Sequence, residues 1–556
     1  MWNYKRFNDH SGYSSYISGD PILPNVSYCY EENEVHYNLP RDYSIDYLTF
    51  RTVESGTFKF SGSTSANTLQ YSLDDGETWT TLAHNTETPT IAANSNILWK
   101  GEGLTINTNS GIGKFISTGT FNVKGNIMSL HFGDDFSGQT SLSGKDYAYR
   151  SLFSGCTGMI SAENLILPAT TLSTACYRNM FQGCTGLTSA PELPATTMSV
   201  SGYTYMFGYC RSLTTAPVLP ATTLANGCYE SMFQSCTSLT TAPALPVTAL
   251  TNSCYYGMFS SCSGLTTAPE LPATTLADSC YGAMFYSCTS LITPPELPAT
   301  GLASNCYSQM FYGCWYLSYT PELPATTLAS TCYRAMFAYC ETITDAPELP
   351  ATALTTSGYS EMFRGCISLT SAPELPATTL ATACYYSMFN GCTSLTTAPV
   401  LSATTLANGC YQSMFINCTS LTSAPTTLPA TTLAASCYYS MFSKCTSLTV
   451  APVLSATTLQ NYCYAGMFSG CTSLTAAPVL PATTLKTGCY NWMFEGCTNL
   501  NYIKAMFTTT PGSSYTSTWV SRVAATGTFV KNSAAQWDVS GTSGIPNGWT
   551  VQTASS

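Results

Sequence analysis

The chain has 556 residues, of which 9% are charged and 12% are aromatic, and its formal net charge is -11 at pH 7. This length allows several domains, and the negative charge argues against a nucleic-acid backbone as a partner. No apolar run reaches about 18 residues, so we predict no membrane insertion. Met1–Arg6 is not followed by an apolar core, so no signal peptide is visible.

Residues 1–45 form an N-terminal segment that is rich in Tyr, Asn, Ser and Asp and cannot build a core alone. Within it, Val26–Tyr30 and Glu34–Tyr37 alternate around a polar turn, which predicts a β-hairpin. Two roles stay open for the segment. It could attach to another virion or surface protein, or it could be a disordered or packed leader.

Residues 46–138 are predicted to form a small β-sandwich-like domain, because apolar residues alternate between turn residues, as at Phe58 and Phe60. The stretch Ser72–Trp79 resembles an Asp-box, the hairpin motif common in sialidase-type propellers. Propeller enzymes carry several copies and separate catalytic residues, whereas this chain has one copy. We interpret the motif as a hairpin whose Asp fixes the turn and whose Trp packs.

Residues 139–507 consist of about 14 units of one repeat. In most units a Cys-Tyr pair is followed by Met-Phe and by a second Cys, and the Phe recurs every 26 residues, apart from one step of 28 and one of 27. A fixed period of about 20 to 50 residues is the signature of a solenoid. The repeated Phe residues are Phe153, Phe181, Phe207, Phe233, Phe259, Phe285, Phe311, Phe337, Phe363, Phe389, Phe415, Phe442, Phe468 and Phe494.

We number the first Cys of each unit i, so that Tyr is i+1, Met i+4, Phe i+5 and the second Cys i+8. At about 100° per residue these positions fall on one arc of a helix, and the variable positions i+2, i+3, i+6 and i+7 fall on the other arc. The partition predicts a short amphipathic helix. Asp278 and Asn408 are suitable caps at its start, and Gly often stands at i+7, as helix C-termini prefer.

Each predicted helix is followed by a proline-containing run, as in Leu265–Leu276. Its first four residues suit a short strand, which ends at the prolines because proline cannot donate to a strand ladder. Stacked strands lie about 4.8 Å apart and helices about 8–10 Å, so we expect a curved array with strands inside and helices outside. The predicted fold class is a repeat α/β solenoid between an N-terminal β-domain and a C-terminal β cap.

The phrase Met-Phe-x-x-Cys-Thr-Ser-Leu-Thr, between the predicted helix and strand, resembles the BspA-type leucine-rich repeats. The resemblance covers some two thirds of the chain and departs from that family in the Leu-Pro-Ala-Thr-Thr-Leu run, which is richer in Pro and Thr than the usual strand. It implies a horseshoe or ladder-like solenoid used for adhesion and binding, in bacteria of mucosal habitats and their genetic elements. It supplies no catalytic residues.

Residues 508–556 leave the period and carry short apolar runs around Trp519, Phe529, Trp537 and Trp549, separated by Gly and Pro turns. A solenoid needs its last unit covered, so we predict a C-terminal β cap. Trp-rich ends can also bind sugar, and we favour the capping role.

The array holds 25 of the 26 cysteines, 14 at i+8 and 11 at i, and Gly202 and Gly358 replace two of the latter. An odd total and this unequal loss argue against obligatory pairs, so we predict buried free thiols. Zinc spacing is lacking, and all four histidines precede the array: His10, His36, His84 and His131. We predict neither an enzyme nor a bound metal or cofactor.

Aromatic residues are frequent at the variable helix positions, where charges are few. Tyr gives a large contact area at low entropic cost, and Tyr and Trp also stack on sugar rings. The alternative without a binding role is a set of scattered exposed tyrosines on a neutral solenoid. The candidate binding residues are Tyr205, Tyr209, Tyr256, Tyr286, Tyr312, Trp315, Tyr316, Tyr339, Tyr386, Tyr439 and Trp492.

Five successive units carry Glu at one position of the proline-containing run. One interpretation is a tolerated surface stripe without a function. The other is a stripe of carboxylates that binds a divalent cation or a basic partner. The acidic stripe consists of Glu270, Glu296, Glu322, Glu348 and Glu374.

From these features we expect a non-catalytic adhesion protein that presents a curved repeat surface to a cell-surface glycan or protein. It would be extracellular, on a bacterial surface or on a phage tail, where release by lysis would explain the missing signal peptide. The alternative is a structural virion or surface component in which the solenoid is a spacer.

Overall fold

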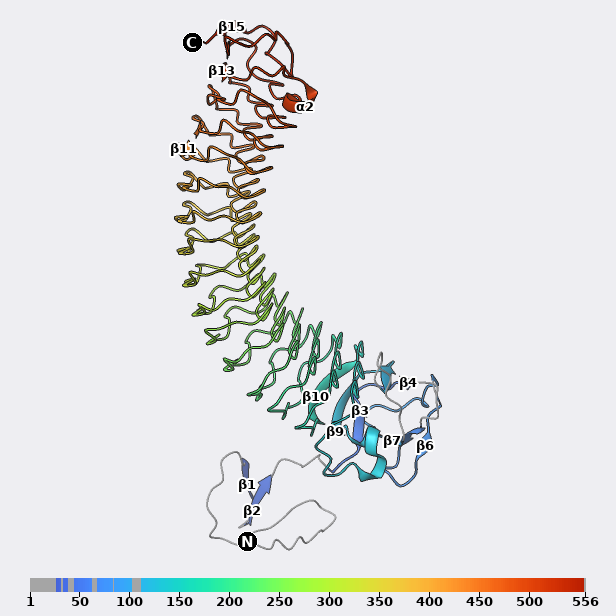
Figure 1. Cartoon of the computed structure of the whole chain (residues 1–556). Coiled ribbons are helices and arrows are strands. Elements are labelled where there is room, and N and C mark those ends of the chain that lie inside the picture. Colours follow the sequence, from blue (N-terminus) through green and yellow to red (C-terminus); the bar gives the residue numbers. More distant parts are fainter. Residues whose placement is uncertain are drawn as a thin grey trace.

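A computed structural model describes residues 45–62, 68–83, 85–102 and 112–554, together with the backbone of two strands at 27–31 and 34–38. The chain forms a curved rod, with a β-domain at one end and stacked coils running to the C-terminus (Figure 1). The remaining residues, His10 and His84 among them, lie outside the described part, as do the side chains of Cys29 and His36.

Nine short strands precede the solenoid. The predicted hairpin is confirmed, since β1 and β2 pair antiparallel. A six-stranded sheet has the order β10-β9-β3-β7-β5-β6, and β4 pairs with β8 in a second sheet. The strands are β1 Ser27–Glu31, β2 Glu34–Asn38, β3 Leu48–Thr52, β4 Phe58–Gly62, β5 Thr68–Ser72, β6 Thr80–Thr81, β7 Asn96–Glu102, β8 Gly113–Ser117 and β9 Phe121–Asn126.

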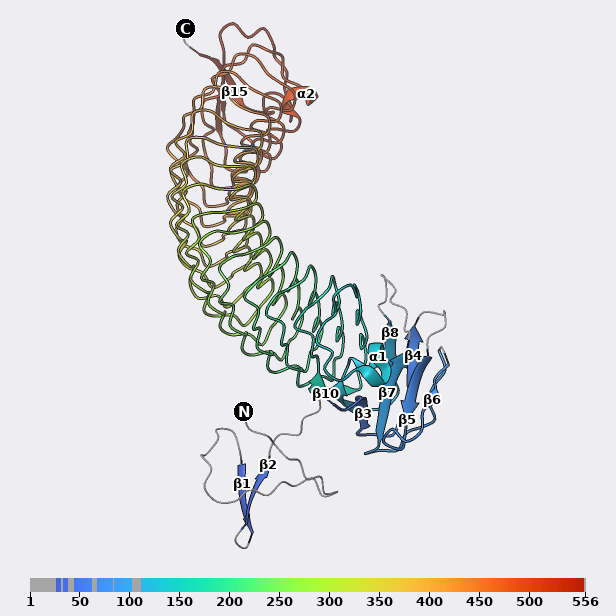
Figure 2. The ribbon, with the colours of Figure 1, turned by 60° about the horizontal axis from the view of Figure 1, so that its bottom comes forward.

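The N-terminal sheets close the first coil of the solenoid. After the short helices α1 (Ser129–Phe132) and η1 (Gly133–Asp135), strand β10 (Met159–Ile166) of the first coil pairs in parallel with β9. The ring of Phe115 on β8 stacks on Phe153 with centroids 5.8 Å apart. The aromatic core of the β-domain therefore continues directly into the core of the solenoid. Figure 2 shows β10 beside the strands of the β-domain.

The Asp-box stretch forms the expected hairpin turn between β5 and β6. The amide of Gly76 donates to Ser72 Oγ, and the amide of Thr78 donates to Asp74 Oδ1 at 2.9 Å. Hydrogen bonds from the Thr78 hydroxyl, the Thr78 amide and the Ser72 hydroxyl lower the pKa of Asp74 to about 2. Trp79 packs against Tyr47, with centroids 5.0 Å apart. The motif is thus a fixed turn with a packed Trp.

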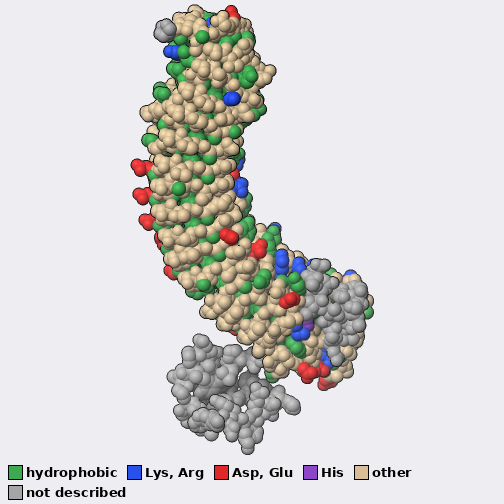
Figure 3. Space-filling model, viewed as in Figure 1, with side chains coloured by type: hydrophobic (Ala, Val, Ile, Leu, Met, Phe, Trp, Pro, Cys, Tyr) green, Lys and Arg blue, Asp and Glu red, His purple; other side chains and the backbone are tan. Residues whose placement is uncertain are grey.

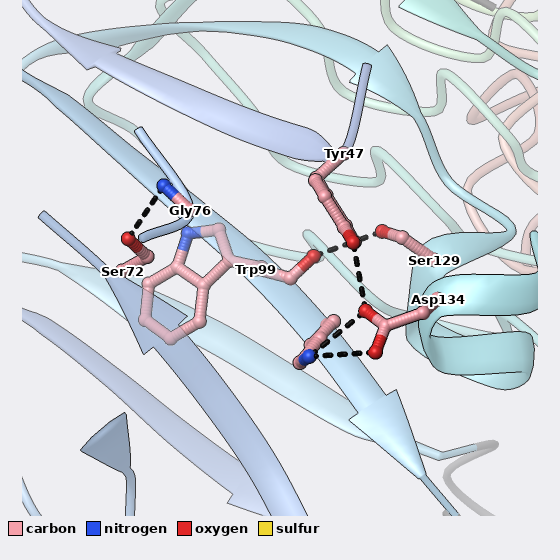
Figure 4. A network of polar contacts seen from close by, with 7 residues as sticks. Tyr47, Ser72, Gly76, Trp99, Ser129 and Asp134 are labelled. Carbon is pink, nitrogen blue, oxygen red and sulfur yellow. Dashed lines mark hydrogen bonds and ion pairs between the residues drawn. The ribbon is translucent and has the colours of Figure 1, made fainter. Parts of the chain in front are cut away.

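A polar network ties α1 and η1 to the sheet (Figure 4). Asp134 accepts hydrogen bonds from Lys100 Nζ at 2.8 Å and from the Tyr47 hydroxyl at 2.7 Å. The lysine and tyrosine bonds hold the pKa of Asp134 below its usual value. Ser129 Oγ donates to the carbonyl of Trp99. The network joins β7, α1 and η1 within the β-domain.

The predicted helix of the repeat is wrong, because the stretch is a run of overlapping turns. In the coil of Cys254, the amides of residues 254, 256, 258, 260 and 262 each donate to the carbonyl three residues earlier. The alternate amides, of residues 253, 255, 257, 259 and 261, donate to the next coil at 2.6–3.1 Å. We call the stretch from i-3 to i+8 the turn run.

The turn run has a period of four residues, which explains the error. Residues at i-1, i+3 and i+7 have positive φ, as at Ser253 (55°), Gly257 (59°) and Ser261 (61°). A positive φ at the third residue is what a type II turn requires. The predicted cap Asp278 instead accepts the amide of Ser304 in the next coil. Gly at i+7 therefore serves a turn and not the end of a helix.

The predicted inward positions are nevertheless buried in every coil. Cys254, Tyr255, Met258, Phe259 and Cys262 are at most 1% exposed. Successive Phe rings stack with centroids 5.3–5.8 Å apart, and successive Tyr rings stack likewise at 5.6–6.0 Å. Two aromatic columns thus run the length of the core.

The predicted free thiols are confirmed, since all 25 described cysteines are buried and unpaired. The i+8 thiols share one contact: each donates to the carbonyl of the Phe in the preceding coil, as Cys262 does to Phe233 at 3.0 Å. Phe115 supplies this carbonyl to Cys156 in the first coil. Burial raises the pKa of these thiols, for Cys288 to about 12. Gly202 and Gly358 replace Cys only at i.

The rest of each coil, called here the proline segment, is only sparsely paired. Isolated parallel bridges join successive coils, such as Thr241 to Thr215 before the prolines and Thr223 to Thr197 after them. Between the first coil and the C-terminal coils, the described residues form regular strands only at β11 (Thr427–Leu428) and β12 (Val453–Leu454), which pair in parallel. The prolines interrupt pairing, as predicted.

The curvature is opposite to our expectation. Strand β11, in the proline segment, lies on the convex edge (Figure 1). Helix α2 (Ser513–Thr516) lies on the concave side, in the column of turn runs, where Gly488 N donates to Ser514 O. Each pair of neighbouring turn runs shares five backbone hydrogen bonds, as paired strands do. The turn runs form the shorter, concave side of the arc. The expected curvature assumed helices that stack more widely than strands, and the turn runs are not helices.

The C-terminal residues form two further, degenerate coils. Strands β13 (Tyr502–Ala505), β14 (Thr528–Lys531) and β15 (Thr550–Thr553) make a parallel sheet. Trp519 takes the place of the repeated Met, since its carbonyl accepts the amide of Phe494 as that of Met493 accepts the amide of Phe468. The indole of Trp519 donates to Gly544 O at 2.9 Å and is fully buried. This Trp closes the core and offers no surface to a sugar.

Candidate binding face

Nine of the eleven aromatic candidates belong to turn runs, and so to the concave side of the arc. Tyr209 and Tyr256 are each 38% exposed, and Trp492 is 37% exposed. The others of this set are half-buried: Tyr205, Tyr286, Tyr312, Tyr339, Tyr386 and Tyr439. The remaining two, Trp315 and Tyr316, follow a turn run directly.

Three of the candidates form a continuous row in the middle of the solenoid. Tyr286 and Tyr312 stack with centroids 4.7 Å apart and an interplanar angle of 4°. Tyr339 meets Tyr312 edge-on at 5.2 Å. The guanidinium of Arg364 lies 5.7 Å from the centre of the Tyr339 ring. We call Tyr286, Tyr312 and Tyr339 the central row.

The backbone at Tyr339 disfavours an aromatic residue. Its φ is 60°, in the left-handed region that Gly and Asn adopt most readily. Its ring lies over Gly365 of the next coil, where an added Cβ would come within 2.6 Å of Tyr339 Cδ1. Tyr339 thus stands on backbone that disfavours a bulky side chain, beside a Gly that leaves its ring room.

The residues that follow the turn run of Tyr312 add exposed aromatic surface. Trp315 is 50% exposed and Tyr316 is 60% exposed. Tyr319, which the sequence analysis missed, is 48% exposed in the same coil. Tyr312 precedes Trp315 by three residues, so these side chains come from one coil. Tyr319 stands where most units have Thr or Ser, and that departure is the signal that could have found it.

A charged cluster next to the central row was also missed. Glu361 bridges two arginines, with Oε2 at 2.8 Å from Arg364 Nη1 and Oε1 at 3.4 Å from Arg334 Nη2. The side chains of Arg334 and Arg364 are 47% and 41% exposed, whereas that of Glu361 is 13% exposed. The hydrogen bond to Glu361 raises the pKa of Arg364. Burial and the neighbouring tyrosines raise the pKa of Tyr312.

The other aromatic candidates do not join this row. Tyr256 lies over Gly282 of the next coil, and its pKa is raised by burial, by Glu230 and by Tyr205. Tyr205 itself packs within contact distance of Gly208. Tyr386, Tyr439 and Trp492 lie in later coils. The eleven candidates therefore form one central group and several separate positions.

The acidic stripe lies on the opposite side of the molecule. All five of its Glu side chains are exposed, in the column of β11 on the convex edge. Figure 3 shows acidic side chains along this edge. Glu322 and Glu348 line a shallow groove of about 530 Å³ together with Pro324, Pro347 and Pro350. Across the described residues, no three His, Cys, Asp or Glu side chains gather as metal ligands would.

The chain matches a family model described as BspA type leucine rich repeat region, in six copies over residues 147–292, 203–344 and 330–475. No curated protein matches it in sequence.

Solved structures similar to it include a leucine rich cell surface protein from Faecalibacterium prausnitzii A2-165 (18% identity, 61% of this chain and 83% of that one, TM-score 0.36). A leucine-rich repeat protein from Bacteroides ovatus ATCC 8483 is 16% identical over 79% of this chain and 96% of that one, with a TM-score of 0.43.

Proposed function

Because the chain belongs to the BspA-type leucine-rich repeat family, we propose that it is a non-catalytic adhesion protein that binds a cell-surface glycan or protein through its concave face. The observation that carries this proposal is the central row. Tyr339 is kept on backbone that disfavours it, in contact with Tyr312 and Arg364. Exposed aromatic and Arg side chains are enriched where proteins recognise partners.

The chemistry of the array supports binding over catalysis. Its thiols are buried, and burial raises their pKa values, so they are poor nucleophiles. His131, the one histidine whose side chain is described, is half-buried in the β-domain and precedes the array. The carboxylates of the array repeat with the coils and do not converge.

We place the protein outside the cell, on a bacterial surface or a phage tail. The Faecalibacterium protein of similar fold is described as a cell surface protein. Across the described residues, none of the helices has the length and apolar character needed to cross a bilayer. Residues 1–45 are the segment that we propose for attachment to another virion or surface protein.

The test is a glycan-array and whole-cell binding screen with the full chain and a Tyr312→Ser, Tyr339→Asn, Trp315→Ser variant. Tyr462→Asn is the matched control, because Tyr462 also has positive φ and lies over a Gly, Gly488, outside the central row. Selective binding that is lost in the triple variant and kept in the control supports the proposal. Absence of binding to any glycan or cell would favour the spacer role.

The acidic stripe offers a second contact surface, for a basic partner. Its grooves expose carboxylates between proline rings, and Glu348 lines both the 530 Å³ groove and its neighbour of about 260 Å³. Polylysine binding should weaken in a Glu322→Gln, Glu348→Gln variant. Equal binding by both proteins, or a calcium affinity that the variant loses, would contradict this assignment.

A further inference from the structure

We propose that the charged end of the central row is a subsite for the acid group of an anionic saccharide, one that bears a carboxylate or a sulfate. This inference rests on the proposed function, and it names the ligand chemistry of the same face. It follows from three features of the cluster: its unbalanced charge, its exposed donors and its aromatic surroundings.

The charge of the cluster is unbalanced. Two guanidinium groups, of Arg334 and Arg364, share the single carboxylate of Glu361. The three side chains therefore carry a net charge of +1, on a chain whose net charge is -11. Figure 3 shows basic side chains at the concave edge of the middle coils and acidic ones at the convex edge. An anion is drawn to the concave side and repelled from the convex side.

The donors of the cluster face solvent. The carboxylate of Glu361 is largely covered, whereas about half of each arginine side chain is exposed. A guanidinium has five N–H donors, and the bonds to Glu361 use only a minority of them. The remaining donors fit the paired oxygens of a carboxylate or sulfate, which arginine binds with two parallel hydrogen bonds.

The aromatic residues suit the rest of a sugar. Tyr286 stacks on one face of the Tyr312 ring, and Tyr339 meets Tyr312 edge-on, so the three phenol rings form one half-buried aromatic row. Trp315 and Tyr316 of the same coil expose half or more of their surface, which the C–H face of a sugar ring can cover. Phenol hydroxyls, an open indole and a guanidinium pair together match a hydroxylated ring with an acid group.

The probes are polygalacturonate for carboxylates, dextran sulfate for sulfates, neutral dextran, and free inorganic sulfate, titrated calorimetrically against the full chain at fixed salt. We expect binding of one or both acidic polymers and none of dextran. Arg364→Gln should weaken that binding about tenfold or more, as the loss of a charged hydrogen bond implies. Arg522→Gln is the matched control, because Arg522 pairs with Glu495 in a balanced pair near the C-terminus.

Glu361→Gln gives a test of opposite sign. It removes the only negative charge of the cluster while it keeps the size of the side chain, so affinity for the acidic polymer should rise. A purely structural role for Glu361 would leave the affinity equal or lower. Thermal unfolding of each variant shows that the fold is kept.

Three results would overturn the subsite. Arg522→Gln could weaken binding as much as Arg364→Gln, free sulfate could bind equally in wild type and Arg364→Gln, or Glu361→Gln could fail to raise the affinity. If neutral glycans or cells bind and acidic polymers do not, the proposed function stands and the subsite fails. If nothing binds, both fail.

Discussion

The ring of Tyr339 occupies the space that a side chain at Gly365 would fill. A Cβ there would lie 2.6 Å from Tyr339 Cδ1, and Gly365 has a φ of 72°. Gly391 of the next coil has similar backbone (φ 81°), but its nearest neighbour would be Gly365 Cα at 3.7 Å. The two glycines therefore separate the effect of backbone strain from that of ring contact.

We expect Gly391→Ala to lower the free energy of unfolding by about 1 kcal/mol through strain alone. Gly365→Ala should cost about 2 kcal/mol or more, because the Tyr339 ring must also move. Urea unfolding measures both. The double variant Gly365→Ala, Tyr339→Ser should return to the loss seen at Gly391, and equal losses in the two single variants would contradict the contact.

The thiol ladder predicts unequal roles for the two cysteines of one coil. Cys392 donates to Phe363 O at 3.1 Å, whereas no such bond is found for Cys384 among the described residues. Cys392→Ala should therefore destabilise the array by about 1 kcal/mol more than Cys384→Ala. Hydrogen exchange of the coil measures the difference. A larger loss at Cys384 would show that volume, and not the thiol bond, decides which cysteines are kept.

His131 predicts a pH dependence of the β-domain. Burial, with a smaller effect of Lys145, lowers its pKa from 6.5 to about 3, and its ring packs against Tyr149. The unfolded chain binds a proton below pH 6.5 and the folded chain does not, so stability falls as the pH falls below 6.5. Between pH 7 and pH 5 the loss is about 2 kcal/mol.

Urea unfolding followed by tryptophan fluorescence at the two pH values measures this loss. His131→Phe removes the titrating group and should abolish the contribution over the same interval. An unchanged pH dependence in the variant would assign the effect to other groups.

Trp519 predicts where the solenoid begins to unfold. Trp519→Ala removes the indole bond to Gly544 and the ring contacts with Phe494 and Phe507, at a cost of about 3–5 kcal/mol. Because each coil contacts mainly its neighbours, hydrogen-exchange protection should fall from the C-terminal end inward. The coils around Phe207 serve as the internal reference. A uniform loss along the rod would mean that the array unfolds as one unit.

The repeat, its inward residues and its free thiols could be predicted from the sequence, because each depends on a pattern that recurs in every unit. The backbone conformation of the turn run could not be predicted in this way. A period of 3.6 and a period of four place i, i+1, i+4, i+5 and i+8 on the same side over so short a stretch. Ser253 and Gly257 suit the positive φ at i-1 and i+3, but Tyr205 and Ala283 at i+3 hide that signal.

The central row and its charged cluster depend on which coils are neighbours. Arg334 and Glu361 are 27 residues apart and meet only because they lie in neighbouring coils. The tyrosines stand out in the sequence by their frequency, but their frequency does not tell which of them touch, as Tyr286 and Tyr312 do. Contacts between residues at variable positions of neighbouring coils do not recur from unit to unit, so no pattern in the sequence predicts them.

The coil that follows Phe415 is one residue longer than its neighbours, and it shows where the rod accepts an insertion. Phe415 and Phe442 are 27 residues apart, yet Ser413 and Phe415 still donate to Tyr439 and Met441 of the next coil. The additional residue lies near Thr427, where β11 forms on the convex edge. Insertions are therefore absorbed on one side while the opposite face keeps its register. A peptide tag or an evolved loop placed at Thr426 would project from the back of the arc and leave the recognition surface intact.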